Sequence, residues 1–300
     1  MHQEIYEQAE GLRRSDLWKI HQSPKHFKQS MEQTESTSAS LTFGIAVHKY
    51  ILEPDTFFDE YAITPKIDRR TKNGKLAWEA FSSECEENNK EPIDEPTFEH
   101  VKAMAEAINQ NPLAKAVLTG QHETEYYWTD RITGEKLKAK CDNLTTYNGK
   151  QYVVDYKTTD SCEDGHFERS SKRYGYQFQA AFYLEAVEQS IGLMNCGFMF
   201  VAQEKKPPYA CRVYACSDAF IETGRIQFRQ YLDTYHECKI TNNWYGYEGP
   251  AVTPQPTLLM DDSERYASRN FQQSGESLYQ STFNSDDFLD ENAEQEEYDV

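Results

Sequence analysis

The spacing of apolar residues divides the chain into a helical first part and a second part rich in strands. Over residues 41–52 the apolar positions recur every three or four residues, as on one face of a helix, and Pro54 ends this pattern. Ser23 followed by Pro24 predicts a helix start, because serine caps free N–H groups and proline fits the first turn. Two further helices are predicted over residues 74–89 and 96–118, the second interrupted at Pro112.

After residue 120 the pattern changes to short runs of β-branched and aromatic residues that are separated by turn residues. Three consecutive strands are predicted, followed by a helix, two more strands and a long closing helix. This order predicts an α/β domain in which helices flank a central mixed sheet. The predicted strands cover residues 123–128, 136–146, 151–157, 196–202 and 210–215, and the predicted helices cover 174–189 and 218–238.

Four regions are expected along the chain. Residues 1–120 form a helical N-terminal part, 121–240 hold the core of the domain, 241–260 extend it, and 261–300 form a disordered acidic tail. The net charge is −19, and the tail contributes −10 of it through twelve acids and two arginines, which leaves −9 for the remainder. Such an acidic chain does not attract DNA as a whole, so DNA binding would require a local basic groove or bound cations.

The sequence predicts a soluble cytoplasmic protein with no membrane partner. It has no run of eighteen apolar residues, and its first ten residues are polar and acidic, unlike a secretory signal. The seven cysteines are scattered, and no two of them form a Cys-x-x-Cys pair. Neither an iron–sulfur cluster nor a zinc knuckle is therefore expected.

The most informative local feature is the Asn148-Gly149 dipeptide, which predicts a two-residue type I′ turn between two strands. Asp142 lies six residues before this turn and Asp155 six residues after it, so the two face each other. In this register they form a non-hydrogen-bonded pair, with Cα atoms about 4.5 Å apart. The alternation of side chains along a strand places Lys157 on the same face as Asp155.

Two carboxylates that face each other on a sheet repel, so this pair favours a divalent cation between them. Oxygen ligands with room for water and a phosphate suit Mg²⁺, and Mn²⁺ is expected to substitute for it. Such an ion polarises a phosphate and lowers the pKa of its bound water, while Lys157 orients the nucleophile or helps to deprotonate it. The hairpin alone leaves a second interpretation open, in which Asp142 and Asp155 are ordinary surface residues and Lys157 forms a salt bridge.

Three motifs, in this order along the chain, resemble the RecB-like branch of the PD-(D/E)XK nuclease superfamily. Asp142 with the segment from Asp155 to Lys157 looks like the PD-(D/E)XK core, which implies a restriction-endonuclease-like fold. The stretch from Gly44 to His48 is similar to an upstream G-x-x-x-H element, whose histidine joins the metal ligands. The residues that the resemblance assigns to the site are His48, Asp142 and Asp155 as metal ligands, Lys157, Gln179 and Tyr183 as further catalytic residues (the last two from a Q-x-x-x-Y element), and Glu125 as a further possible member.

Within this branch, residues 12–240 are similar to the RecE-like (exodeoxyribonuclease VIII-type) exonucleases of phages and prophages. The resemblance implies a Mg²⁺-dependent enzyme that degrades double-stranded DNA from its ends, from 5′ to 3′. It further implies a homo-oligomeric ring and a partner protein that anneals the resulting 3′ single strands. A basic loop in the same relative position supplies the phosphate-contact candidates Arg69, Arg70, Lys72 and Lys75, although a solvated charge run remains an alternative.

Two other functions remain open at this point. An endonuclease with the same fold would cut closed-circular DNA, which an exonuclease leaves intact. A catalytically silent DNA-binding or scaffold module would not depend on Asp155. The second alternative gives no chemical reason for keeping Asp142, Asp155 and Lys157 together.

Overall fold

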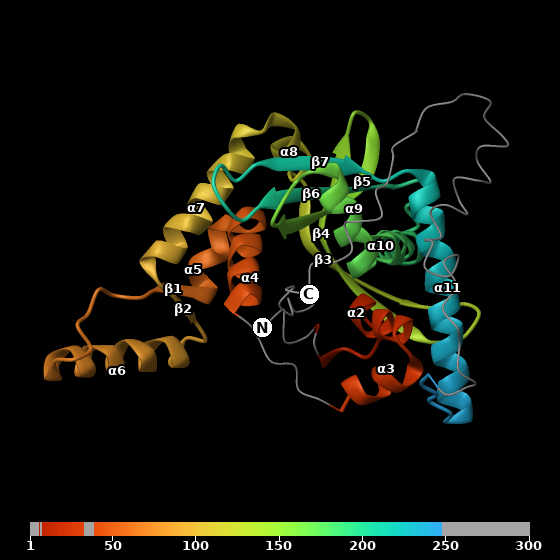
Figure 1. Cartoon of the computed structure of the whole chain (residues 1–300), viewed down its shortest axis with the longest axis horizontal. Coiled ribbons are helices and arrows are strands. Elements are labelled where there is room, and N and C mark those ends of the chain that lie inside the picture. Colours follow the sequence, from red (N-terminus) through yellow and green to blue (C-terminus); the bar gives the residue numbers. More distant parts are fainter. Residues whose placement is uncertain (1–5, 7, 33–38, 248–300) are drawn as a thin grey trace, which may run out of the picture. The chain divides into compact units, whose positions relative to one another are not determined.

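The computed structural model describes residue 6, residues 8–32 and residues 39–247 (Figure 1). The predicted acidic tail, 261–300, and most of the predicted extension lie outside these residues. None of the helices in the described part of the chain has the length and apolar character that crossing a membrane requires. The helices are α2 (Arg14–Trp18), α3 (Pro24–Ser30), α4 (Ala39–Leu52), α5 (Phe57–Glu60), α6 (Lys72–Glu87), α7 (Glu95–Gln110), α8 (Pro112–Val117), α9 (Asp164–Tyr174), α10 (Tyr176–Ile191) and α11 (Asp218–Thr241), with short 3₁₀ helices η1 (Lys19–His21) and η2 (Pro54–Thr56).

The central feature is a five-stranded mixed sheet in the order β3-β4-β5-β6-β7. Strands β5 and β6 run parallel, and the other neighbouring pairs are antiparallel. This arrangement confirms the predicted α/β fold with helices around a mixed sheet. The strands are β3 (Gln121–Thr129), β4 (Lys136–Tyr147), β5 (Lys150–Thr159), β6 (Gly197–Glu204) and β7 (Cys211–Ala215).

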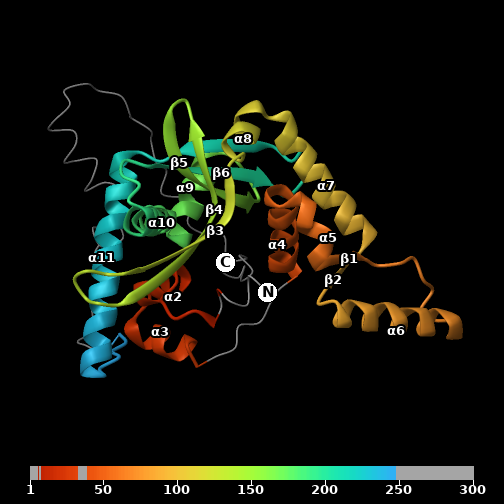
Figure 2. The same cartoon turned by 180° about the vertical axis from the view of Figure 1, so that it is seen from behind.

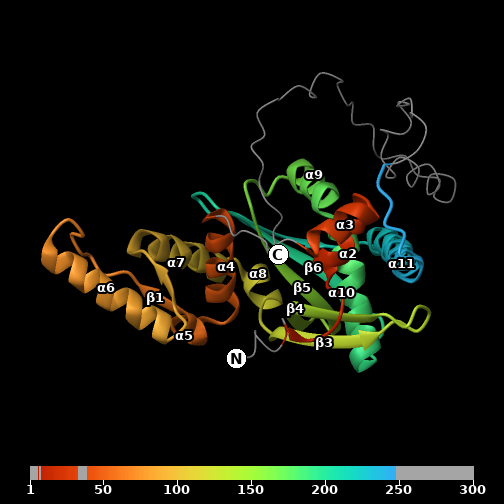
Figure 3. The ribbon, with the colours of Figure 1, turned by 90° about the horizontal axis from the view of Figure 1, so that it is seen from below.

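Each face of the sheet buries its own hydrophobic core, and β6 shows why. Phe198 and Phe200 point into a core that also contains residues of α2, α10 and α11. Met199 and Val201 point to the other face, into a core with residues of α4, α7 and α8. Side chains on both faces of β6 are buried, and its sequence is therefore apolar at nearly every position. Figures 2 and 3 show the sheet between these two groups of helices.

The β4–β5 hairpin has the predicted turn and register. Asn148 and Gly149 have φ angles of 50° and 78°, the positive values that a type I′ turn requires. Pairing runs from Tyr147 opposite Lys150 to Asn143 opposite Val154. Asp142 and Asp155 come at the next position, but the ladder ends before them because β4 separates from β5, so the predicted pairing of these two residues is not formed.

Beyond this point a segment near the N-terminus takes the place of β5 beside β4. The Leu12 N–H donates to the Lys136 carbonyl at 2.9 Å, and the Lys138 N–H donates to the Leu12 carbonyl at 3.0 Å. The separation of β4 from β5 therefore costs no backbone hydrogen bonds at these residues.

The structure contains elements that the apolar pattern did not predict. Helix α9 precedes α10, and Gly175 in a left-handed conformation (φ 65°) separates the two. A Cβ atom at Gly175 would lie 2.3 Å from the Trp18 ring, so this junction admits only glycine. Two three-residue strands, β1 (Tyr61–Ile63) and β2 (Glu91–Ile93), pair in parallel within the helical part.

Candidate active site

Helix α4 brings His48 to the sheet. Ala46 and Val47 are almost fully buried and anchor α4 in the core, which turns His48 toward β3 and β4. The His48 Nε2 atom lies 2.9 Å from Asp142 Oδ2, and its Nδ1 atom lies 3.4 Å from Glu123 Oε1. One ligand atom from each of these three side chains lies within 4.8 Å of the others, a spacing that a single metal ion can bridge.

Glu123 lies opposite Asp142, because the register of β3 with β4 is the same on both sides of it: His122 faces Asn143 and Thr124 faces Cys141. Glu123 itself has a φ of 49° and is not among the paired residues. Glu125, the acidic residue selected from the sequence, instead accepts a hydrogen bond of 2.7 Å from the Tyr127 hydroxyl. The structure thus brings Glu123, and not Glu125, to His48 and Asp142.

Asp155 is the most buried acid of the site, with 1% of its side chain exposed. Its Oδ1 accepts a hydrogen bond of 2.7 Å from Gln179 Nε2. The Lys157 ammonium lies 2.9 Å from its Oδ2, which agrees with the predicted shared face. Asp142 Oδ2 accepts a hydrogen bond of 2.8 Å from the Tyr156 backbone N–H. Backbone therefore holds Asp142, whereas the side chains of Gln179 and Lys157 hold Asp155.

Helix α10 supplies the remaining predicted residues. Gln179 is 3% exposed, and Tyr183 lies one helical turn later on the same side of the helix. Burial raises the pKa of Tyr183 well above its usual value, and the charges of Asp155 and Asp142 raise it further. Tyr183 therefore stays a neutral phenol beside the aspartates. The structure brings together His48, Asp142, Asp155, Lys157, Gln179 and Tyr183, and it adds Glu123.

The charges in the site depend strongly on one another. Burial lowers the pKa of His48, but the carboxylates of Asp142, Glu123 and Asp155 outweigh this effect and raise it to about 9. Burial raises the pKa of Asp155 to about 6, against the opposing effect of the Lys157 ammonium. Burial also lowers the pKa of Lys157, but Asp155 outweighs it and the net shift is upward. At neutral pH, without a bound cation, His48 and Lys157 therefore carry protons.

The donor set fits a divalent cation. Glu123 Oε1 and Asp155 Oδ2 are buried and form no hydrogen bond within the described residues, although each lies in an ion pair, with His48 and Lys157 respectively. A buried carboxylate oxygen that accepts no hydrogen bond has a lone pair available, and a metal ion would bind it. Two carboxylates and one imidazole, with the Asp155 carboxylate beside them, suit Mg²⁺ or Mn²⁺ better than a soft metal.

The basic loop that carries Arg69 and Arg70 lies away from the cluster of His48, Glu123 and Asp142. Arg70 forms a two-pronged ion pair with Asp68, at 2.9 and 3.1 Å. The Arg69 guanidinium stacks on the Trp78 ring, 3.1 Å from its centroid. Lys72 and Lys75, like both arginines, are exposed. Figures 1 and 3 place α6, which follows this loop, on the far side of α4 from the sheet.

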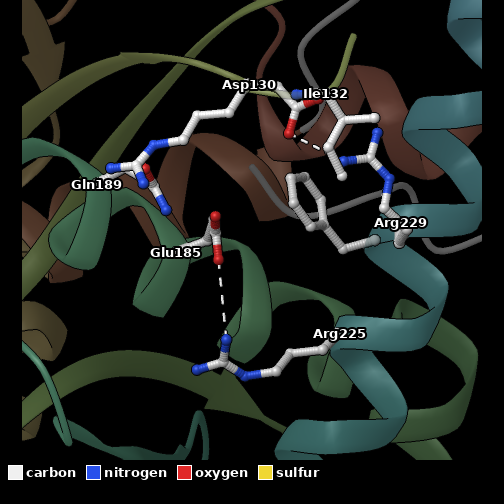
Figure 4. Close-up of a pocket in the computed structure, with 8 residues that line it drawn as sticks. Asp130, Ile132, Glu185, Gln189, Arg225 and Arg229 are labelled. Carbon is white, nitrogen blue, oxygen red and sulfur yellow. Dashed lines mark hydrogen bonds and ion pairs between the residues drawn. The ribbon is translucent and has the colours of Figure 1, made fainter.

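A cavity of about 340 Å³ lies between the β3–β4 hairpin, α10 and α11 (Figure 4). Its walls are charged: Arg229 lies 2.9 Å from Asp130, and Arg225 lies 3.8 Å from Glu185. These opposite charges pair with one another and connect α11 to the hairpin and to α10. His48, Glu123 and Asp142 do not line this cavity.

Comparisons with known proteins agree with this fold. The model of the family described as a PDDEXK-like domain of unknown function (DUF3799) matches residues 14–251. A putative exonuclease from Eubacterium rectale is similar in structure, with a TM-score of 0.50 and 16% identity over 81% of this chain and 91% of that one. A second solved structure, SSO0001, shares 14% identity over 58% of this chain and 73% of its own, and its TM-score of 0.28 is too low to support a conclusion. Curated protein sequences give no significant match. Since the family model covers most of the chain, this protein belongs to the family of PDDEXK-like domains and has a PD-(D/E)XK nuclease fold.

Proposed function

We propose that the protein is a Mg²⁺-dependent exodeoxyribonuclease that degrades linear double-stranded DNA from its ends, from 5′ to 3′. The product, a 3′ single strand, would serve recombination through a partner annealing protein, and the enzyme would act as a homo-oligomeric ring. The observation that carries the proposal is the cluster of His48, Glu123 and Asp142 beside Asp155 and Lys157. The order of motifs resembling RecE-like exonucleases supports an exonuclease, and a protein of similar fold is named a putative exonuclease.

In this mechanism His48, Glu123, Asp142 and Asp155 would hold the metal ion. A bound Mg²⁺ would polarise the scissile phosphate and lower the pKa of a coordinated water. Without a bound cation Lys157 carries a proton at neutral pH, and in this form it would donate a hydrogen bond that orients the attacking water. This favours the first of the two roles that the sequence allowed for Lys157.

The α10 residues fix the site. Gln179 holds one oxygen of Asp155 at 2.7 Å, which turns the other oxygen toward Lys157 and the metal position. Tyr183, a neutral phenol, can donate a hydrogen bond without adding negative charge to a site that already has three carboxylates. Both residues therefore orient groups and do not exchange protons.

The test uses linear duplex DNA labelled at the 5′ end in one sample and at the 3′ end in another, with closed-circular DNA of the same sequence as control. In Mg²⁺ the 5′ label should be released early and the circle should stay intact. Cutting of the circle would identify an endonuclease. No hydrolysis in Mg²⁺ or Mn²⁺ would favour a silent binding module.

A further inference from the structure

A second lysine, Lys140, lies at the edge of the metal cluster. Its ammonium is 2.5 Å from Glu123 Oε2, while the other oxygen of Glu123 lies in the cluster with His48 and Asp142. Lys140 thus shares a carboxylate with the proposed metal site. Its side chain is 30% exposed, whereas that of Lys157 is 10% exposed, so Lys140 is more accessible to a large substrate.

The sheet geometry explains this position. Lys140 and Asp142 are two residues apart on β4, so their side chains share a face. Across the strands, Lys140 is paired with Glu125, whose carboxylate accepts from the Tyr127 hydroxyl. Glu123 lies opposite Asp142 in the same register and therefore diagonal to Lys140, and the Lys140 ammonium binds the Glu123 carboxylate.

The charges of the site change when a divalent cation binds. Glu123, Asp142 and Asp155 supply three negative charges, and a divalent ion compensates two of them. The ion also withdraws electron density from Glu123, which weakens the attraction between Glu123 and Lys140. A flexible, partly exposed ammonium beside a metal site is then available to a phosphate, because lysine binds phosphate as a compact point charge.

We propose that Lys140 binds a backbone phosphate of the DNA strand that enters the metal site. This role rests on the proposed nuclease function and adds a contact at the site itself to the predicted contacts of the basic loop. Lys140 would then set substrate affinity, while Lys157 acts on the chemical step.

The test measures the binding of a fluorescent DNA duplex by anisotropy over a series of salt concentrations. Ca²⁺ replaces Mg²⁺ in this assay, so that binding is measured without hydrolysis. Lys140→Met should weaken binding about three- to tenfold and lower the slope of log affinity against log salt by about 0.9. Lys140→Arg should restore most of the slope because it keeps the charge. Lys136→Met is the matched control: Lys136 lies on the same strand and face and pairs with Glu10 at 2.6 Å, and its loss should leave the slope unchanged.

Three results would overturn the proposal. The first is a slope for Lys140→Met equal to that of the unmodified protein, and the second is an equal loss for Lys136→Met. The third is loss of Ca²⁺ binding, measured by calorimetry, in Lys140→Met, since this would mean that Lys140 only positions Glu123. If the unmodified protein neither binds nor hydrolyses DNA, the nuclease function itself fails and this role fails with it. Normal hydrolysis with an unchanged slope rejects the role of Lys140 alone.

Discussion

Binding of a metal ion should release one proton from His48. The carboxylates around His48 raise its pKa to about 9, compared with about 6.5 for an ordinary histidine. At pH 7.5 the protonated form therefore exceeds the neutral form by roughly thirtyfold. Only the neutral imidazole binds a metal, so the ion must displace this proton, at a cost of about 2 kcal/mol.

The direction of the pH effect follows from the same shift. A raised pKa means that protonated His48 stabilises the metal-free fold below about pH 6.5, and this stability is lost as the pH rises through about 9. Metal affinity should change in the opposite sense and rise about tenfold per pH unit between pH 6.5 and 8.5. Asp155, with a pKa of about 6, is already ionised over most of this range and adds little.

Isothermal titration calorimetry with Mn²⁺ at pH 7.5, in buffers of different ionisation enthalpy, measures the number of protons released. We expect about one proton per ion for the unmodified protein and a value near zero for His48→Gln. His166→Gln, which changes a histidine on α9, serves as control and should still release about one proton. If the unmodified protein released no proton, or if His48→Gln released as many, His48 would not be a ligand with the shifted pKa described above.

Three further changes test other parts of the account. Glu123→Gln should reduce hydrolysis of linear DNA at least tenfold, whereas Glu125→Gln should leave it within about twofold; equal effects would contradict the choice of Glu123 as the ligand. Gly224→Ala should lower the free energy of unfolding by about 3 kcal/mol in urea titrations, because its Cβ would lie 1.8 Å from the Gln177 carbonyl oxygen and force α10 and α11 apart; an unchanged midpoint would refute this. Burial raises the pKa of Glu135, but Lys239 and His236 of α11 outweigh this effect, and the net shift is downward. The ionised Glu135 therefore stabilises the fold above about pH 4.5, and this stabilisation is lost as the pH falls further. Melting temperatures of Glu135→Gln and the unmodified protein should therefore differ at pH 7 and converge in acid.

The parts of the site that follow from local rules were predictable from the sequence. A type I′ turn fixes the register of a hairpin, so Asn148 and Gly149 were enough to place Asp142 near Asp155. Strand alternation placed Lys157 beside Asp155, and the separation of 2.9 Å between their charged groups agrees. These rules act over a few residues, and no tertiary information is needed to apply them.

The parts that depend on side-chain conformation or on distant segments were not predictable. Glu123 and Glu125 lie on the same face of β3, so strand alternation does not tell which of them contacts His48 and Asp142. Lys140 is likewise paired across the strands with Glu125, yet its ammonium binds Glu123, which the strand pattern alone does not reveal. The position of α6 depends on how the helical part packs, and no periodicity in the sequence reports it.

The most direct test of the central claim is the release of acid-soluble nucleotides from linear duplex DNA by the unmodified protein, Asp155→Asn and Asp160→Asn, each in Mg²⁺. Asp160 is an exposed aspartate just beyond the end of the same strand, paired with Lys205 at 3.2 Å, so it controls for the loss of one carboxylate. We expect the unmodified protein and Asp160→Asn to release nucleotides at similar rates, and Asp155→Asn to be slower by at least a hundredfold while it keeps its fold by circular dichroism. A folded Asp155→Asn protein that degrades DNA at the normal rate would show that the chemistry takes place elsewhere.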